Sequence, residues 1–216
     1  MVLVASVIGF AARAHFYSAV EDASRMPSGL DHSAEDIVRD LLGSGTTANA
    51  CVLSKGRSTS YNPASDRLLL LEGSGDRYDV AALALGLHEA GHATCCCKHP
   101  FIKGLLPAAR IVRGLVSIAW LFALVLTLAH ALGAGAPSVV IVVLACYAAV
   151  VSCGVILCIL EATASLWAAR IMRDSLQLGC NQMRKARSLL CSAFIVYVLE
   201  AFAIHSAFIR PSSPSH

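Results

Sequence analysis

The segment His88-Glu89-Ala90-Gly91-His92 combines residue types and a spacing that suit metal-dependent chemistry. On a helix, residues four positions apart emerge on the same face with Cβ atoms about 5–6 Å apart, so His88 and His92 can bind one metal ion. Glu89 emerges beside them and can act as a general base toward a water molecule that the ion activates. Zinc suits this role because it lowers the pKa of water to about 7. We therefore predict one zinc ion at this segment.

Glu161 is the candidate for the third protein ligand that catalytic zinc usually has. It is the first acidic residue after an uncharged run, residues 114–160. Ser165, one helical turn later, can hydrogen-bond a ligand and orient it. The residues alone leave a second interpretation equally open, in which Glu161 only ends an apolar helix at a membrane interface. Glu200, an ionisable residue inside a later apolar stretch, is the rival third ligand.

The uncharged run at residues 114–160 determines where these side chains can meet. A membrane span needs about 20 apolar residues, so the run is long enough for two spans. Gly, Ala, Pro and Ser at residues 133–138 supply a turn near its middle. Hydrophobic residues make up 56% of the 216-residue chain and charged residues only 14%, against about 25% charged residues in a soluble domain. We therefore predict a transmembrane hairpin.

Basic residues flank this hairpin on both sides, and its turn carries none. Those before it are Lys98, Lys103, Arg110 and Arg113, and those after it are Arg170, Arg173, Arg184, Lys185 and Arg187. The positive-inside rule places both flanks in the cytoplasm. Because the motif at residues 88–92 and Glu161 both adjoin these flanks, we expect the active site at the cytoplasmic face of the cell membrane, with the lipid bilayer as a partner.

Other function classes find less support in the composition. The net charge is +3, and the chain has no basic stripe with interleaved aromatic residues, so we expect no nucleic-acid partner. The nine cysteines lack paired spacing, which favours a reducing compartment over a disulfide framework. The run Cys95-Cys96-Cys97 is best interpreted as small apolar filler on a helix, with lipidation or a soft-metal site left open.

In their order along the chain, these features resemble the YugP-like membrane zinc metallopeptidase family. The resemblance rests on the segment from Leu87 to Ala93, the basic stretch from Pro100 to Arg113, the apolar hairpin, and Glu161-Ala162-Thr163-Ala164-Ser165. It extends from about residue 28 to residue 197. It implies that His88 and His92 bind zinc, that Glu89 is catalytic and that Glu161 is the third ligand. Ser60 and Asn62 depart from the His and Asp that the family usually has around its tyrosine.

We therefore predict a mainly α, integral membrane helical bundle with a small α+β, zincin-like cytoplasmic segment that carries the motif helix. The expected parts are an apolar N-terminal segment at 1–16, either a short anchor or signal-like; a cytoplasmic segment at 17–98 with the zinc-binding helix at 78–93; a basic amphipathic linker at 99–113; the hairpin at 114–160; a cytoplasmic helix with the third ligand at 161–187; a C-terminal transmembrane helix at 188–209; and a tail at 210–216. Ser33 and Asp36 resemble a capping box at the start of a short helix.

The residues and the resemblance together predict a membrane-bound zinc metalloendopeptidase that hydrolyses peptide or protein substrates, membrane proteins among them. Glu89 takes a proton from the attacking water and delivers it to the leaving amine. An extended substrate can pair with the strand expected at residues 68–71. The alternative is a non-catalytic membrane protein, either a zinc-stabilised scaffold or a pore subunit, and the scarcity of polar residues in the hairpin counts against a pore.

Overall fold

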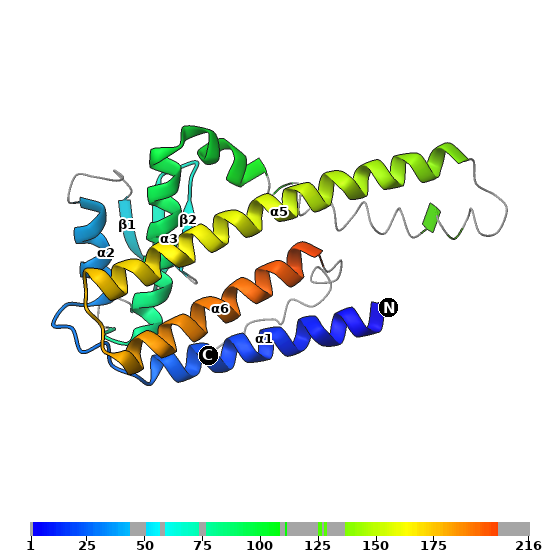
Figure 1. Cartoon of the computed structure of the whole chain (residues 1–216). Helices are drawn as coiled ribbons and strands as arrows, with labels where there is room; N and C mark the ends of the chain where they lie inside the picture. Colours follow the sequence, from blue (N-terminus) through cyan, green and yellow to red (C-terminus); the bar gives the residue numbers. More distant parts are fainter. Residues whose placement is uncertain are drawn as a thin grey trace.

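Long helices with a small sheet at one end make up the part of the chain that the computed structural model describes (Figure 1). This part covers residues 2–43, 51–56, 59–73, 77–108, 111, 125–126, 128 and 137–202. Its elements are α1 (Val2–Ser24), α2 (Ala34–Gly43), β1 (Cys51–Gly56), β2 (Ser60–Asn62), β3 (Arg67–Leu71), α3 (Val80–Lys98), α5 (Pro137–Asp174) and α6 (Cys180–Phe202). Residues 100–108 form a further helix. The mainly helical class is therefore confirmed.

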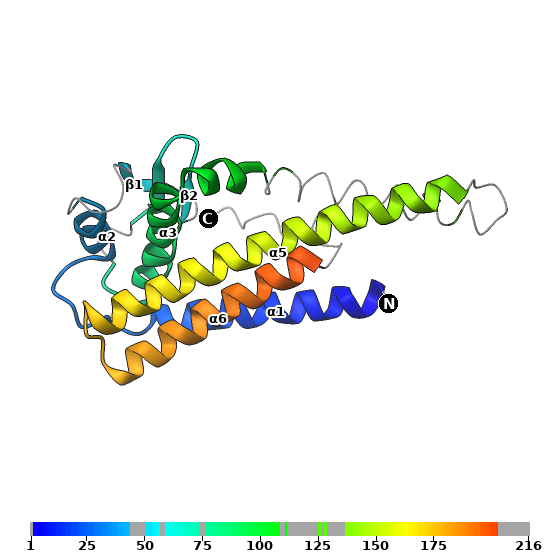
Figure 2. The same cartoon turned by 45° about the horizontal axis from the view of Figure 1, so that its top comes forward.

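Helices α1, α5 and α6 lie side by side in both views, and α3 crosses them at the end where the sheet lies (Figures 1 and 2). Helix α6 packs against both α1 and α5, and α3 packs against α5, α6 and α2. Lys185 on α6 donates a hydrogen bond to Asp22 on α1, with a distance of 2.7 Å between Nζ and Oδ2. Helix α1 is continuous from Val2, because no proline interrupts it. It therefore spans the predicted boundary at residue 16.

The sheet has the strand order β1-β3-β2, with β1 parallel and β2 antiparallel to β3. Leu68 and Leu70 point into the core, as the alternation along β3 requires. Because β3 is the central strand, Arg67, Leu68 and Leu69 are paired on both sides. The prediction that a substrate pairs with residues 68–71 is therefore wrong for Leu68 and Leu69, and it stays a prediction for Leu70 and Leu71.

Local signals in the sequence explain how α2 and α3 begin. Ser33 and Asp36 form the predicted capping box: Asp36 N donates to Ser33 Oγ at 3.2 Å, and Ser33 N donates to Asp36 Oδ2 at 3.3 Å. Asp79 is the N-cap of α3 and accepts a hydrogen bond from Ala82 N at 2.9 Å. Most side chains of helix α3 from Val80 to Cys96 are buried and the others are half-buried, which makes it the central helix of this end of the molecule.

Helix α5 has 38 residues, so it is about 57 Å long and exceeds the roughly 30 Å hydrocarbon core of a bilayer. It continues without a break through Glu161, where the sequence predicted the boundary between the hairpin and a separate helix. Among the described residues, one helical stretch, Val151–Asp174, is long and apolar enough to cross a membrane. The predicted first hairpin arm, apart from residues 125–126 and 128, lies outside the described residues, as do residues 203–216.

Candidate metal centre

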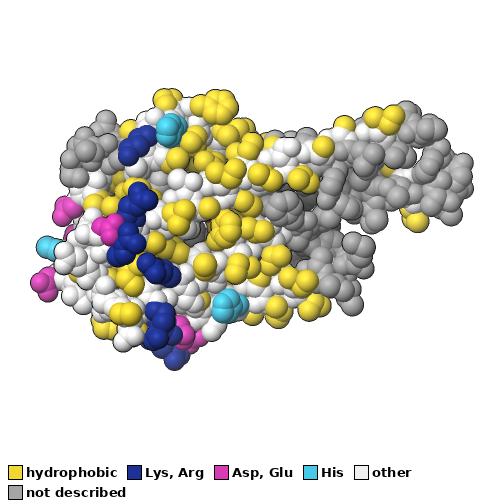
Figure 3. Space-filling view, viewed as in Figure 1, with side chains coloured by type: hydrophobic (Ala, Val, Ile, Leu, Met, Phe, Trp, Pro, Cys, Tyr) yellow, Lys and Arg dark blue, Asp and Glu magenta, His cyan; other side chains and the backbone are white. Residues whose placement is uncertain are grey.

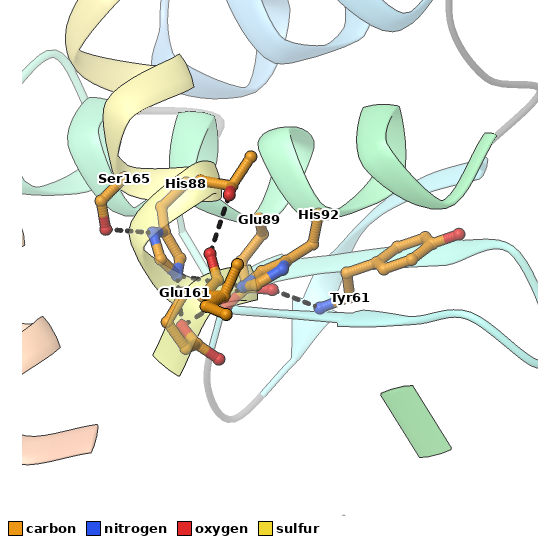
Figure 4. A network of polar contacts seen from close by, with 8 residues as sticks. Tyr61, His88, Glu89, His92, Glu161 and Ser165 are labelled. Atoms are coloured by element: carbon orange, nitrogen blue, oxygen red, sulfur yellow. Dashed lines mark hydrogen bonds and ion pairs between the residues drawn. The ribbon is translucent and has the colours of Figure 1, made fainter. Parts of the chain in front are cut away.

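His88 and His92 of α3 converge with Glu161 of α5 on one point in the interior (Figure 4). The distance from His88 Nε2 to Glu161 Oε2 is 3.1 Å, and that from His92 Nε2 to the same oxygen is 3.3 Å. The two Nε2 atoms lie 3.2 Å apart. All three residues are buried. The structure thus brings together two segments that are 69 residues or more apart in the sequence.

Gly91 allows α3 and α5 to approach closely enough for this convergence. A Cβ added at Gly91 would lie 3.0 Å from both Cα and the carbonyl oxygen of Ala164, and 3.3 Å from its Cβ. Two residues of minimal size therefore meet where the helices cross. Glu161 lies almost one helical turn before Ala164, which brings its carboxylate to the two histidines on the neighbouring turn of α3.

The three donor atoms fit a zinc ion in number, type and spacing. Zinc bonds to imidazole nitrogen and carboxylate oxygen at about 2.0–2.2 Å in a tetrahedral arrangement, whose ligand atoms lie about 3.3 Å apart. The three distances observed here are 3.1, 3.2 and 3.3 Å. A buried carboxylate next to two buried imidazoles is costly unless a cation or protons compensate its charge. Among the described residues, this trio is the group that could hold a metal ion.

Ser165 fixes the orientation of His88. Its Oγ lies 3.1 Å from His88 Nδ1. When Nδ1–H donates to Ser165 Oγ, the lone pair of Nε2 is available on the side of Glu161, which is the tautomer that a metal ligand requires. The predicted contact of Ser165 with a candidate ligand is confirmed, since the ligand that it contacts is His88.

Glu89 has a backbone partner on the sheet. Its Oε2 accepts a hydrogen bond from Tyr61 N at 2.8 Å, so the Tyr61 amide in β2 faces α3 and not β3. The Glu89 side chain lies next to the metal centre while its carboxylate is held at the outer edge of β2 (Figure 4). This contact could not be predicted from the sequence, because a backbone donor leaves no signature in residue type.

The sequence also singled out the cysteine run and Glu200. Cys95, Cys96 and Cys97 occupy successive helical positions, which point in different directions. Cys96 is buried and Cys97 is exposed, so the three thiols do not converge, and burial raises the pKa of Cys95. The Glu200 side chain lies outside the described residues.

Comparison with known proteins identifies the group to which this arrangement is related. A family model described as "Putative neutral zinc metallopeptidase" matches residues 1–210. The match covers almost the whole chain and confirms the resemblance that the motifs indicated. No curated protein and no solved structure matches the chain.

Proposed function

We propose that this chain, which belongs to the putative neutral zinc metallopeptidase family, is a membrane-bound zinc endopeptidase. The observation that carries the proposal is the convergence of His88 Nε2, His92 Nε2 and Glu161 Oε2 next to the carboxylate of Glu89. A metal site alone would also suit a scaffold. The Glu89 carboxylate lies beside that site and accepts a hydrogen bond from Tyr61 N–H instead of contacting the ligands. A carboxylate in this position favours a hydrolase.

In the proposed hydrolysis, each residue of the site has a separate role. His88, His92 and Glu161 would hold one zinc ion, with Ser165 orienting His88. Zinc would supply Lewis-acid activation of a water molecule and of the scissile carbonyl. Glu89 accepts a proton from the attacking water and transfers it to the leaving amine as the C–N bond breaks.

The side of β2 that faces away from β3 lies beside Glu89. Arg67, Leu68 and Leu69 of strand β3 are paired on both sides, so they offer no free edge. Tyr61 N–H contacts Glu89 from the outer side of β2, which places this side directly beside the catalytic carboxylate. A substrate peptide would pass the metal centre on this side of β2, without using the Tyr61 N–H that already donates to Glu89.

The surface supports attachment to a membrane. Large hydrophobic side chains are exposed along α1, α5 and α6, among them Phe10, Ile159 and Ile195. On the face that Figure 3 shows, a band of Lys and Arg lies between much of this apolar surface and the end where most of the acidic side chains lie. Basic residues at a membrane boundary favour the cytoplasmic side. We therefore place the metal centre near the cytoplasmic membrane face.

Glu89→Gln tests the proposed activity, because glutamine keeps the shape of the side chain but cannot accept the proton. We expect the variant to bind zinc as tightly as the wild type and to lose cleavage of a peptide library by on the order of 10²-fold or more. Zinc content by elemental analysis and cleavage by mass spectrometry measure the two properties. Undiminished cleavage by the variant would remove Glu89 from the mechanism. Zinc binding without any cleavage by the wild type would favour the scaffold.

A further inference from the structure

We propose that Tyr61, Asp66 and Lys103 form a tether that positions the Glu89 carboxylate beside the metal centre. This inference rests on the proposed function, in which Glu89 is the general base. It deepens that function by assigning three positioning residues, which act on the reaction through Glu89.

The tether is an unbroken chain of polar contacts from a cation to the catalytic carboxylate. Lys103 Nζ donates to Asp66 Oδ2, and the Tyr61 hydroxyl donates to Asp66 Oδ1 at 2.8 Å. The backbone N–H of Tyr61 donates to Glu89 Oε2, also at 2.8 Å. Tyr61 thus contacts Asp66 through its side chain and Glu89 through its backbone.

The charges along the tether fix the direction of each hydrogen bond. Hydrogen bonds from Lys103 and then Tyr61 hold the pKa of Asp66 below its usual value, so Asp66 is a carboxylate that only accepts. Burial raises the pKa of Tyr61, and the hydrogen bond to Asp66 raises it further. The Tyr61 hydroxyl therefore remains protonated and donates to Asp66.

Strand β2 needs a support of this kind because its own pairing is short. It has three residues, and it pairs with β3 along one side. Asp66 lies at the end of the turn between β2 and β3, in the left-handed backbone region with φ of 48°, which Asp adopts more readily than most residues. By contacting both Tyr61 and Lys103, Asp66 holds β2 and the turn against the helix at residues 100–108.

The ion pair between Lys103 and Asp66 is exposed, which favours a role in positioning Glu89 over a role in stabilising the fold. The side chains of Lys103 and Asp66 are 40% and 45% exposed, and ion pairs that are this accessible contribute little to folding. Tyr61, in contrast, is only 1% exposed. Because its backbone N–H donates to Glu89, a shift of Tyr61 would also move the Glu89 carboxylate. Substitution of Lys103 should therefore change the site while the protein stays folded.

The test compares Lys103→Met, Lys103→Arg, Asp66→Asn and Tyr61→Phe in the full chain. Asn tolerates the left-handed backbone at position 66, and Phe retains the Tyr61 N–H.

We expect Lys103→Met to lower kcat about fivefold, the upper range for an accessible ion pair, and we expect Lys103→Arg to keep kcat close to the wild-type value. Asp66→Asn and Tyr61→Phe should each lower kcat about tenfold, as loss of a hydrogen bond predicts. Zinc affinity and KM should stay close to wild type. Lys185→Met, which breaks the pair with Asp22, is the matched control.

Hydrogen–deuterium exchange supplies a readout that does not depend on catalysis. Faster exchange in peptides covering residues 59–62 is expected in Lys103→Met and Asp66→Asn, but not in Lys185→Met or Lys103→Arg. Unchanged exchange and unchanged kcat in the first two variants would overturn the tether. A parallel loss of zinc affinity and thermal stability would also overturn it, since that outcome indicates support of the fold alone. If the wild type cleaves nothing, the proposed function fails while the exchange measurements still test the tether.

Discussion

At the scale of single residues, the metal centre depends on a few groups whose types were visible in the sequence. The spacing of His88 and His92 placed both on one helical face, and the position of Glu161 after an uncharged run made it a candidate. The distances of 3.1–3.3 Å between their ligand atoms support that choice over an isolated interfacial carboxylate. The contact between Tyr61 N–H and Glu89 could not be predicted, because it joins a backbone donor to a side chain 28 residues away.

Ser165→Ala tests how much the orientation of His88 contributes to metal binding. Without the hydroxyl at 3.1 Å from Nδ1, the ring is free to adopt the wrong tautomer or to rotate. We expect zinc affinity to fall about 10–100-fold, as measured by competition with a chelator of known affinity. Thr163→Ala is the control, because its exposed hydroxyl bonds only to the backbone oxygen of Ile159 on the same helix. Equal affinities for both variants would show that Ser165 does not act on the metal.

At the scale of elements, the crossing of α3 and α5 determines whether the ligands meet. The sequence predicted a helix at residues 78–93, and the structure has it at Val80–Lys98. The predicted start lies two residues before the observed one, which follows the N-cap Asp79. The end could not be predicted, because the cysteine run lacks a helix-stopping residue. The order of the strands could not be predicted either, because hydrophobic alternation shows which face of β3 is buried but not which strands pair with it.

Gly91→Ala tests this crossing. The added methyl group would lie 3.0 Å from backbone atoms of Ala164, so the helices must move apart. We expect a loss of about 1–3 kcal/mol in the free energy of unfolding and a clear loss of zinc affinity. Thermal denaturation and chelator competition measure the two effects. Gly104→Ala is the matched control, because nothing lies within 4 Å of a Cβ at that helical position. Wild-type zinc affinity in Gly91→Ala would contradict the requirement for close approach.

At the scale of the whole molecule, the face in Figure 3 shows a band of basic side chains beside an exposed apolar surface. The sequence predicted such an arrangement from the uncharged run and its basic flanks. The sequence did not predict that α5 continues past Glu161 as one helix. Helix α5 joins the apolar part to Glu161 without a break, because residues 150–165 contain no proline and their one glycine, Gly154, is tolerated in a helix. The metal centre and the apolar surface therefore share one continuous helix.

Membrane extraction tests this organisation. We expect the full chain to remain with isolated membranes after washes with high salt and alkaline carbonate, and to be released only by detergent. The reason is that an apolar surface buried in lipid is insensitive to salt, whereas contacts of the basic band alone are screened. Release by salt would indicate a peripheral protein and contradict the proposed membrane-spanning arrangement.

The central claim is that Glu161 closes a zinc site with His88 and His92. Its most direct test is the zinc content and zinc affinity of purified wild type beside Glu161→Ala, with Glu21→Ala on the exposed face of α1 as the control. We predict one zinc ion per chain for the wild type and for the control, and a loss of zinc affinity of at least about 100-fold for Glu161→Ala. Equal stoichiometry and affinity in Glu161→Ala, or a wild type that binds no zinc, would contradict the account.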